Sequence, residues 1–122
     1  MATMRYLVSD VGEAISFYAD RLGFEVVERY GVAMAIVRLG DLDLWLAGPT
    51  SSAARAMPDG REPAPGGWNR LVITVEDLDA IVAQLGTGGA VFRNEIVEGP
   101  GGRQILVEDP AGNVVELFEP AS

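Results

Sequence analysis

The strongest constraint on the fold is an internal repeat of two halves. When Asp10 is aligned with Asp77, 67 positions later, the predicted elements follow in the same order in each half: a strand, a helix and three further strands. Each aspartate precedes apolar residues at helical spacing and is therefore predicted to cap a helix. A repeat of this kind has to be recognised before a fold is assigned. We therefore expect an α+β chain made of two related halves.

The first half shows the repeat most clearly. Residues 5–9 predict a strand, Asp10 and Glu13 have the spacing of a capping box, and the helix is expected to stop at Gly23. A turn signal at Gly40-Asp41 separates the last two strands of this half. The three strands after the helix are predicted at residues 24–29, 33–39 and 42–47.

The second half repeats the pattern after a long connection. Residues 49–69 hold four prolines and Gly66-Gly67, and loops of this length are usually functional or mobile. We place the first module at residues 1–48, the linker at 49–69 and the second module at 70–122. Residues 98–102 are expected to form a turn rather than a phosphate-binding loop. The strands of the second half are predicted at residues 70–75, 90–97, 104–108 and 114–119, with a helix after Asp77 that stops at Gly86 to Gly89.

Composition excludes several kinds of chemistry. The 122 residues include no cysteine and no histidine, which removes thiolate sites, the commonest metal ligand and the commonest general base. All nine basic residues are arginine, so no lysine can form a Schiff base. A net charge of −9 disfavours nucleic acid and anionic membranes as partners, weakly favours a cationic guest and otherwise supports solubility. No signal peptide or membrane-spanning run is visible, so we expect a cytoplasmic location.

Three segments resemble the vicinal oxygen chelate superfamily, the group of glyoxalases, bleomycin-resistance proteins and extradiol dioxygenases. They are YLVSDVGEAISFYADRLGF at residues 6–24, RLVITVEDLDAIVAQL at 70–85 and EDPAGNVVELFEP at 108–120. The last of these, a DPxGNxxEL turn and strand after such a repeat, is fairly specific. The resemblance covers nearly the whole chain apart from the linker.

The resemblance implies two tandem βαβββ modules whose mixed sheet curls around a cleft, with the helices outside. It also implies a homodimer, in which modules pair either within one chain or by exchange between two. Metal enzymes of the superfamily place up to four ligands on strands that face the cleft. Carried over residue by residue, the four ligand positions of the family fall on Thr3, Trp45, Arg70 and Glu116.

These four residues do not predict a metal site. Arginine has no lone pair to offer and keeps a positive charge, tryptophan cannot coordinate, and threonine is a weak ligand. One carboxylate does not hold an ion, so we expect no metal and no other cofactor. We predict instead that the guanidinium of Arg70 pairs with Glu116, because a pair with hydrogen bonds offsets much of the cost of burying a carboxylate.

Strand alternation assigns side chains to the two faces of the predicted sheets. Met4, Tyr6 and Val8, like Leu71, Ile73 and Val75, are expected to face the helices. The opposite faces would form a mostly apolar small-molecule pocket with a few polar anchors. Trp68, at the end of the linker, is positioned to close its mouth. The predicted ligand-binding residues are Thr3, Arg5, Leu7, Trp45, Trp68, Arg70, Val72 and Thr74, with Glu116 as the candidate catalytic residue.

Several functions remain open from the sequence. The favoured hypothesis is a metal-independent small-molecule-binding protein, drug-sequestering like the bleomycin-resistance proteins. The alternative is a glyoxalase-like or dioxygenase-like lyase, isomerase or oxidoreductase that uses Glu116 as base or metal ligand and Arg70 to stabilise an anion. A structural or partner-binding role is the third. Trp45 and Trp68 can equally be packing residues, and Glu116 can be an ordinary ion-pair partner.

Overall fold

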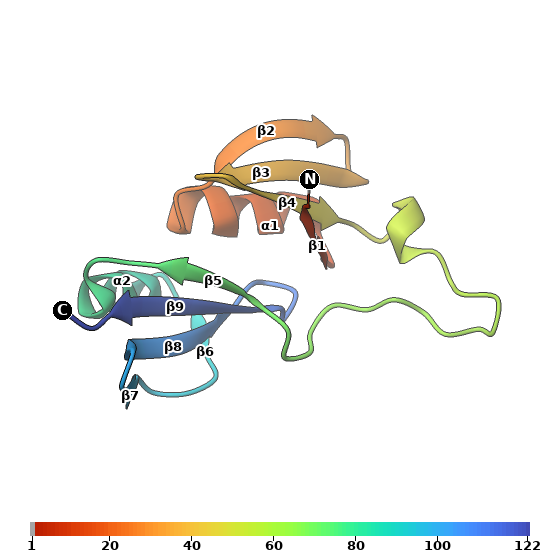
Figure 1. The fold of residues 1–122 in the computed structure, drawn as a ribbon. Helices are drawn as coiled ribbons and strands as arrows, with labels where there is room; N and C mark the ends of the chain where they lie inside the picture. Colours follow the sequence, from red (N-terminus) through yellow and green to blue (C-terminus); the bar gives the residue numbers. More distant parts are fainter. Residues whose placement is uncertain (1) are drawn as a thin grey trace. The chain divides into compact units, whose positions relative to one another are not determined.

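The first half of the chain folds in the predicted order. A computed structural model describes residues 2–122, which form two compact units. The first extends to Gly66 and includes Pro110–Asn113, and the second comprises Gly67–Asp109 and Val114–Ser122. The elements of the first unit are β1 (Met4–Leu7), α1 (Val11–Ile15), η1 (Ser16–Arg21), β2 (Glu25–Tyr30), β3 (Met34–Leu39), β4 (Leu42–Ala47) and the short η2 (Ser52–Ala54) (Figure 1).

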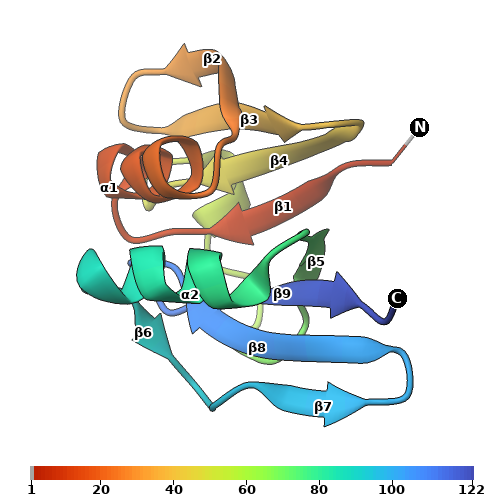
Figure 2. The same ribbon diagram turned by 90° about the vertical axis from the view of Figure 1, so that its left-hand side faces the viewer.

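The four strands of the first unit form one mixed sheet in the order β1-β4-β3-β2. β1 runs parallel to β4, and the other neighbouring strands are antiparallel. The parallel pair follows from the helical segment between β1 and β2, since a crossover is needed before a strand can return in the same direction. The helical segment lies across one face of this sheet (Figure 2).

The helix of the first unit begins as predicted and continues differently. The side chain of Asp10 accepts a hydrogen bond of 2.9 Å from the backbone N–H of Glu13, as an N-cap should. A regular α-helix up to Gly23 was expected, but Ser16–Arg21 form a π-helix. The adjacent Phe17 and Tyr18 are both buried within this π-helix.

Aromatic packing fixes this helix against the sheet. Tyr18 is fully buried, and its ring contacts Phe17 and Phe24 at centroid distances of 5.2 and 5.4 Å. Tyr6 of β1 lies 6.5 Å from the same ring, again edge to face. Edge-to-face pairs of this kind add to the stability gained from burial of the rings. The face of β1 that was expected to point at the helix therefore does so.

The second unit repeats the arrangement with a longer helix. Its elements are β5 (Leu71–Thr74), α2 (Leu78–Thr87), β6 (Val91–Phe92), β7 (Val97–Gly99), β8 (Gly102–Glu108) and β9 (Val114–Pro120). The sheet order is β5-β9-β8-β6, with β7 also paired to β8, and β5 runs parallel to β9. Asp77 caps α2 by accepting a 3.0 Å hydrogen bond from the N–H of Ala80. α2 covers one face of this sheet (Figure 2).

The helix of each unit stops at glycines of the repeat. Gly23 and Gly89, which the sequence alignment pairs after a one-residue slip, have φ angles of 79° and 86°. These left-handed values cost little only for glycine, so each residue lets the chain turn from helix to strand. The predicted stops are confirmed, although α2 itself continues to Thr87.

The strand predicted at residues 90–97 is wrong as a single element. It is split into β6 and β7, because the side chain of Asn94 replaces the backbone at the break. Asn94 Oδ1 accepts a 2.9 Å hydrogen bond from the N–H of Leu106, a donor that a continuous strand would have paired with a carbonyl. The turn expected at residues 98–102 is shorter than predicted: Glu98 and Gly99 end β7, Gly102 begins β8, and only Pro100 and Gly101 form the turn between them.

The fold class is confirmed: two mixed sheets with few helices, α+β, and neither sheet closes into a barrel. No helix within residues 2–122 is long and apolar enough to cross a membrane. Residues 49–66 group with the first unit, and the module limits at residues 48 and 70 stay a prediction. The largest fully buried side chains are Tyr18, Leu44, Leu46, Leu78, Leu85, Leu117, Val37, Val107, Val114 and Val115.

Candidate functional site

In the first unit, the face opposite the helix carries the predicted pair Arg5 and Trp45. These residues are Cα partners in the parallel β1–β4 ladder, and so their side chains lie on the same face of the sheet. Tyr6 and Val8, at the alternate positions, are buried at 5% and 3% exposure. The predicted division of β1 into two faces is therefore confirmed.

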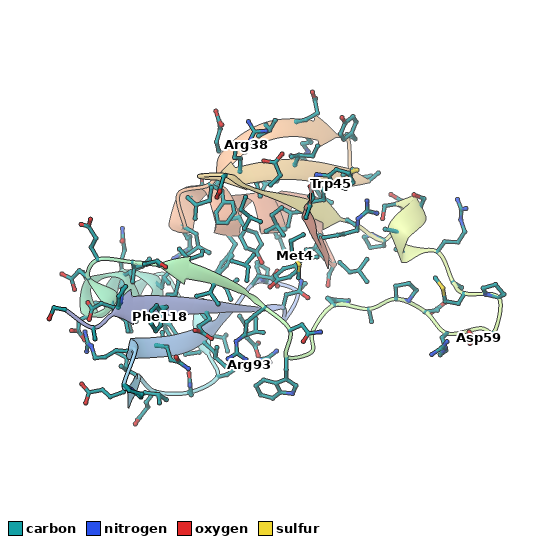
Figure 3. The ribbon with its side chains drawn as sticks, viewed as in Figure 1. Met4, Arg38, Trp45, Asp59, Arg93 and Phe118 are labelled. Atoms are coloured by element: carbon teal, nitrogen blue, oxygen red, sulfur yellow. The ribbon has the colours of Figure 1, made fainter. Side chains whose placement is uncertain are left out.

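Arg5 lies over the aromatic ring of its neighbour. The guanidinium carbon of Arg5 is 5.0 Å from the ring centroid of Trp45, which is within cation–π range. Figure 3 labels Trp45 on β4. Within residues 2–122, no carboxylate comes within 4.0 Å of the Arg5 guanidinium, whereas Arg38 on the same sheet pairs with Asp43 at 2.6 Å. Arg5 is thus held by stacking and not by an ion pair.

An open pocket of about 340 Å³ is lined by Arg5 of this pair. Arg5 lines it together with Met34 of β3 and Ala47 of β4, so its floor belongs to the sheet. The segment after β4 supplies three hydroxyl-bearing residues on its rim. The complete lining is Arg5, Tyr30, Ala33, Met34, Ala47, Thr50, Ser51 and Ser52. The sequence did not predict the rim residues, because the hydroxyl-bearing segment carries no pattern beyond that of a loop.

In the second unit, Arg70 and Glu116 form the predicted ion pair. Nε and one terminal nitrogen of Arg70 lie 3.0 and 2.9 Å from the same oxygen, Oε1 of Glu116. The other terminal nitrogen donates to the carbonyl of Trp68 at 3.3 Å. Glu116 is only 8% exposed, so its charge is compensated where little water reaches it. The sequence hypothesis of an arginine paired with the remaining acid is confirmed.

A second cluster on this unit joins Trp68, Arg93 and Glu108. The guanidinium carbon of Arg93 lies 4.5 Å from the ring centroid of Trp68 (Figure 3 labels Arg93). Nε of Arg93 donates to Glu108 at 2.8 Å, and another of its nitrogens donates to the carbonyl of Gly67 at 2.7 Å. The sequence analysis assigned no role to Arg93 or Glu108. Their contact follows from the β6–β8 pairing, which depended on the strand that was wrongly predicted.

The remaining predicted residues are placed as follows. Thr3 is exposed just before β1, and Leu7 is half-buried at the end of β1. Val72 and Thr74 are exposed on β5, and Val72 is the Cα partner of Glu116. Trp68 is 67% exposed beside the start of β5. Thr3, Arg5, Leu7 and Trp45 belong to the first unit, and Trp68, Arg70, Val72, Thr74 and Glu116 belong to the second.

A family sequence model decides the family. The model described as Glyoxalase/Bleomycin resistance protein/Dioxygenase superfamily matches residues 1–117. The chain belongs to this superfamily. A search of curated proteins found no match.

Solved structures of the superfamily share the fold. An antibiotic-binding protein, TnmS3, from Streptomyces sp. CB03234 is 27% identical with a TM-score of 0.70, over 99% of this chain and 97% of that one. A bleomycin-binding protein from Streptomyces verticillus, solved with copper(II)-bleomycin, is 26% identical with a TM-score of 0.62, over 98% and 95%. Lactoylglutathione lyase from Agrobacterium tumefaciens is 24% identical with a TM-score of 0.73, over 97% and 92%.

The donor chemistry of this superfamily member does not fit a metal ion at the four ligand positions that the resemblance assigns. Of Thr3, Trp45, Arg70 and Glu116, only the glutamate is an effective oxygen ligand, and its Oε1 already accepts from Arg70. A cation placed there would also meet the fixed positive charge of the guanidinium. No group of three or more His, Cys, Asp or Glu that could hold an ion occurs in the described part of the chain.

Proposed function

We propose that this protein binds a small organic molecule on the faces of its sheets that the helices leave open, without a metal ion. The candidate residues are Thr3, Arg5, Leu7 and Trp45 on the first unit and Trp68, Arg70, Val72 and Thr74 on the second. Drug sequestration is the specific activity that we propose. Two similar proteins, above 25% identity and nearly full-length, are described as an antibiotic-binding protein and a bleomycin-binding protein, which supports this choice.

The ion pair of Arg70 and Glu116 carries the proposal. An arginine that donates two nitrogens to one carboxylate oxygen takes the position from which that oxygen would reach a metal. The surrounding surface contains what a binding site needs: an aromatic ring at Trp45, apolar side chains such as Val72 and a few charged anchors. Binding uses such groups directly and requires no proton transfer.

The enzymatic alternative uses the same two residues. Glu116 would act as a base or hold an ion, and Arg70 would stabilise a developing anion. Burial of Glu116 beside a cation is the observation in its favour. The guanidinium contacts oppose it, since they occupy Oε1 of Glu116, and a cation bound at the other carboxylate oxygen would still meet the fixed positive charge of Arg70.

Metal analysis of the purified protein separates the two hypotheses. We expect less than stoichiometric manganese, nickel, iron or zinc, and no rise in melting temperature when these ions are added. A ligand that binds only the folded state raises its stability, so a bound ion would be visible in this assay. A rise that is lost in Glu116→Gln but kept in Glu108→Gln, the matched acid paired with Arg93, would reverse our ranking.

A thermal-shift screen of antibiotics then tests the binding activity itself. We expect at least one compound to raise the melting temperature of the metal-free protein and to be recovered unchanged from the complex. Conversion of that compound to a product would favour the enzymatic alternative. No shift with any compound would count against drug sequestration.

We further propose that the protein works as a homodimer in the cytoplasm. The dimer is what membership of the superfamily implies, and the net charge of −9 suits neither nucleic acid nor an anionic membrane. Sedimentation equilibrium would measure the mass directly. A monomer at micromolar concentration would contradict the dimer.

A further inference from the structure

We propose that the pocket at Arg5 recognises an anionic group, a carboxylate or a phosphate, on a small ligand with an apolar or aromatic body. This inference rests on the proposed binding function and names the class of ligand. It reverses the weak expectation of a cationic guest that the net charge of −9 gives.

The absence of a counter-ion is the first step of the argument. The chain has 18 acidic residues, and five arginines form ion pairs within residues 2–122, yet no carboxylate lies within 4.0 Å of Arg5. Trp45 stacks with Arg5 but cannot neutralise its charge. The guanidinium therefore keeps hydrogen-bond donors for an external acceptor, and carboxylate or phosphate suits its planar geometry best.

The register of the two sheets explains why this counter-ion is missing. Trp45 is the partner of Arg5, and Glu116 is the partner of Val72, the residue 67 positions after Arg5. At equivalent positions, the second unit has an acid with its own arginine, whereas the first has an arginine beside an aromatic ring. An anionic ligand would give Arg5 the negative counter-charge that Glu116 gives Arg70.

The other residues that line the pocket indicate what the remainder of the ligand should be. Thr50 and Ser52 add hydroxyl groups that can donate to an anion, while Ser51 already donates its hydroxyl to the carbonyl of Gly48 at 2.7 Å. Met34 and Ala47 offer an apolar wall for a hydrocarbon body. The volume of about 340 Å³ lies at the lower end of the range for small-molecule sites, about 300–1,000 Å³, and so suits a small ligand.

The charges around the pocket disfavour a cationic ligand. It would be repelled by Arg5, and the aromatic face of Trp45 that could attract it already lies against the guanidinium. The pocket lining includes no acidic side chain. The charge of Arg5 inside the pocket thus outweighs the net charge of the chain. Most of the other charges lie farther from a bound ligand, and dissolved salt screens their effect on it.

Calorimetric titration with four phenyl compounds tests the inference on the full-length protein. We expect phenylacetate and phenyl phosphate to bind at least about tenfold more tightly than the neutral phenylacetamide, and phenethylamine to bind most weakly. Arg5→Gln should remove this preference by weakening both anions about tenfold while leaving the amide unchanged. Arg21→Gln is the matched control, since Arg21 is exposed in the same unit and forms no ion pair there.

Fluorescence locates the binding event. In Trp68→Phe protein, Trp45 is the remaining tryptophan, and we expect phenylacetate to change its emission in a saturable way, with the dissociation constant that calorimetry gives for the same variant. Equal binding of the amide, tighter binding of the amine, or equal losses in Arg5→Gln and Arg21→Gln would each overturn the inference. These results leave the proposed metal-free binding intact, whereas a stoichiometric metal ion would overturn that function and not the anion preference.

Discussion

Trp45 stands in the first sheet at the register position that Glu116 occupies in the second. Each is the Cα partner of a residue on the first strand of its unit, Arg5 or Val72, and these two partners are related by the repeat. One half of the repeat has therefore an aromatic ring where the other has an acid. The acid is paired with Arg70, so neither of these two register positions presents an uncompensated carboxylate to a metal ion.

The ion pair of Arg70 and Glu116 predicts a measurable coupling energy. Arg70→Met leaves an 8%-exposed carboxylate without its partner, and we expect a loss of about 1–3 kcal/mol in the free energy of unfolding. The loss should stay below that of a fully buried pair, because the Arg70 side chain is 29% exposed. The double variant Arg70→Met/Glu116→Leu should recover much of the unfolding free energy that Arg70→Met loses. Urea denaturation would measure both values.

The pair of Arg38 and Asp43 provides the control for this cycle. Its side chains are 45% and 30% exposed, so Arg38→Met should cost clearly less unfolding free energy than Arg70→Met. Additive effects of Arg70→Met and Glu116→Leu, with no recovery in the double variant, would contradict the coupling.

Trp45 predicts an effect on binding. For any compound that raises the melting temperature, Trp45→Ala should weaken the affinity by about tenfold or more, because aromatic anchors dominate small interfaces. Trp45→Phe should keep most of the affinity, since the ring face beside Arg5 is retained. Isothermal titration calorimetry would measure both. Unchanged affinity in a folded Trp45→Ala protein would remove Trp45 from the site.

The fold was predictable because the same signals for helix start and helix end occur in both halves of the repeat. Asp10 and Asp77 cap helices as expected, and Gly23 and Gly89 adopt the left-handed conformation that ends them. Local patterns also gave the two faces of β1, since alternation depends only on the period of a strand. The ion pair of Arg70 and Glu116 was predictable because both residues lie at positions that the family resemblance assigns.

The rest depended on contacts that no local pattern carries. The break in the strand at residues 90–97 arises from Asn94 and Leu106, which are 12 positions apart. Arg93 and Glu108 meet only because β6 pairs with β8. The π-helix at Ser16–Arg21 has no local signal, because Tyr18 and Leu22 keep the spacing of an α-helix in the sequence.

The hydrogen bonds of Asn113 indicate that the turn of the DPAGN segment, residues 109–113, stabilises the fold. It is 5% exposed, donates from Nδ2 to the carbonyl of Leu7 at 2.7 Å and accepts at Oδ1 from the N–H of Gly66 at 2.8 Å. Asn113→Ala should cost about 1–3 kcal/mol of unfolding free energy, because both backbone groups lose a partner. Asn113→Asp keeps the acceptor for Gly66 but turns a carboxylate oxygen toward the Leu7 carbonyl at a buried position, so it should cost at least as much as Asn113→Ala. Asn69→Ala, at an exposed position, should change stability by less than about 0.5 kcal/mol in the same urea titration.

Glu119 links the last strand to the start of α2 and predicts a dependence of stability on pH. The N–H of Leu78 donates to Glu119 at 3.1 Å, and Arg103 donates to it at 2.9 Å and to Asp79 at 2.9 Å. The Leu78 hydrogen bond, and then the Arg103 guanidinium, lower the pKa of Glu119 below its ordinary value of 4.5. The Arg103 hydrogen bond likewise lowers the pKa of Asp79 below 3.8.

The sign of the effect follows from these lowered pKa values. A carboxyl group whose pKa is lower in the folded state stabilises the fold above its ordinary pKa, and the contribution is lost as the pH falls through the folded pKa. We therefore expect the melting temperature to drop as the pH falls below 4.5, the ordinary value for Glu119. Glu119→Gln should start from a lower melting temperature at pH 7 and lose less between pH 6 and pH 3. Glu95 is an exposed acid that forms no ion pair within residues 2–122, so Glu95→Gln should follow the wild-type curve. Parallel curves for Glu119→Gln and wild type would show that protonation of Glu119 does not change the stability of the fold.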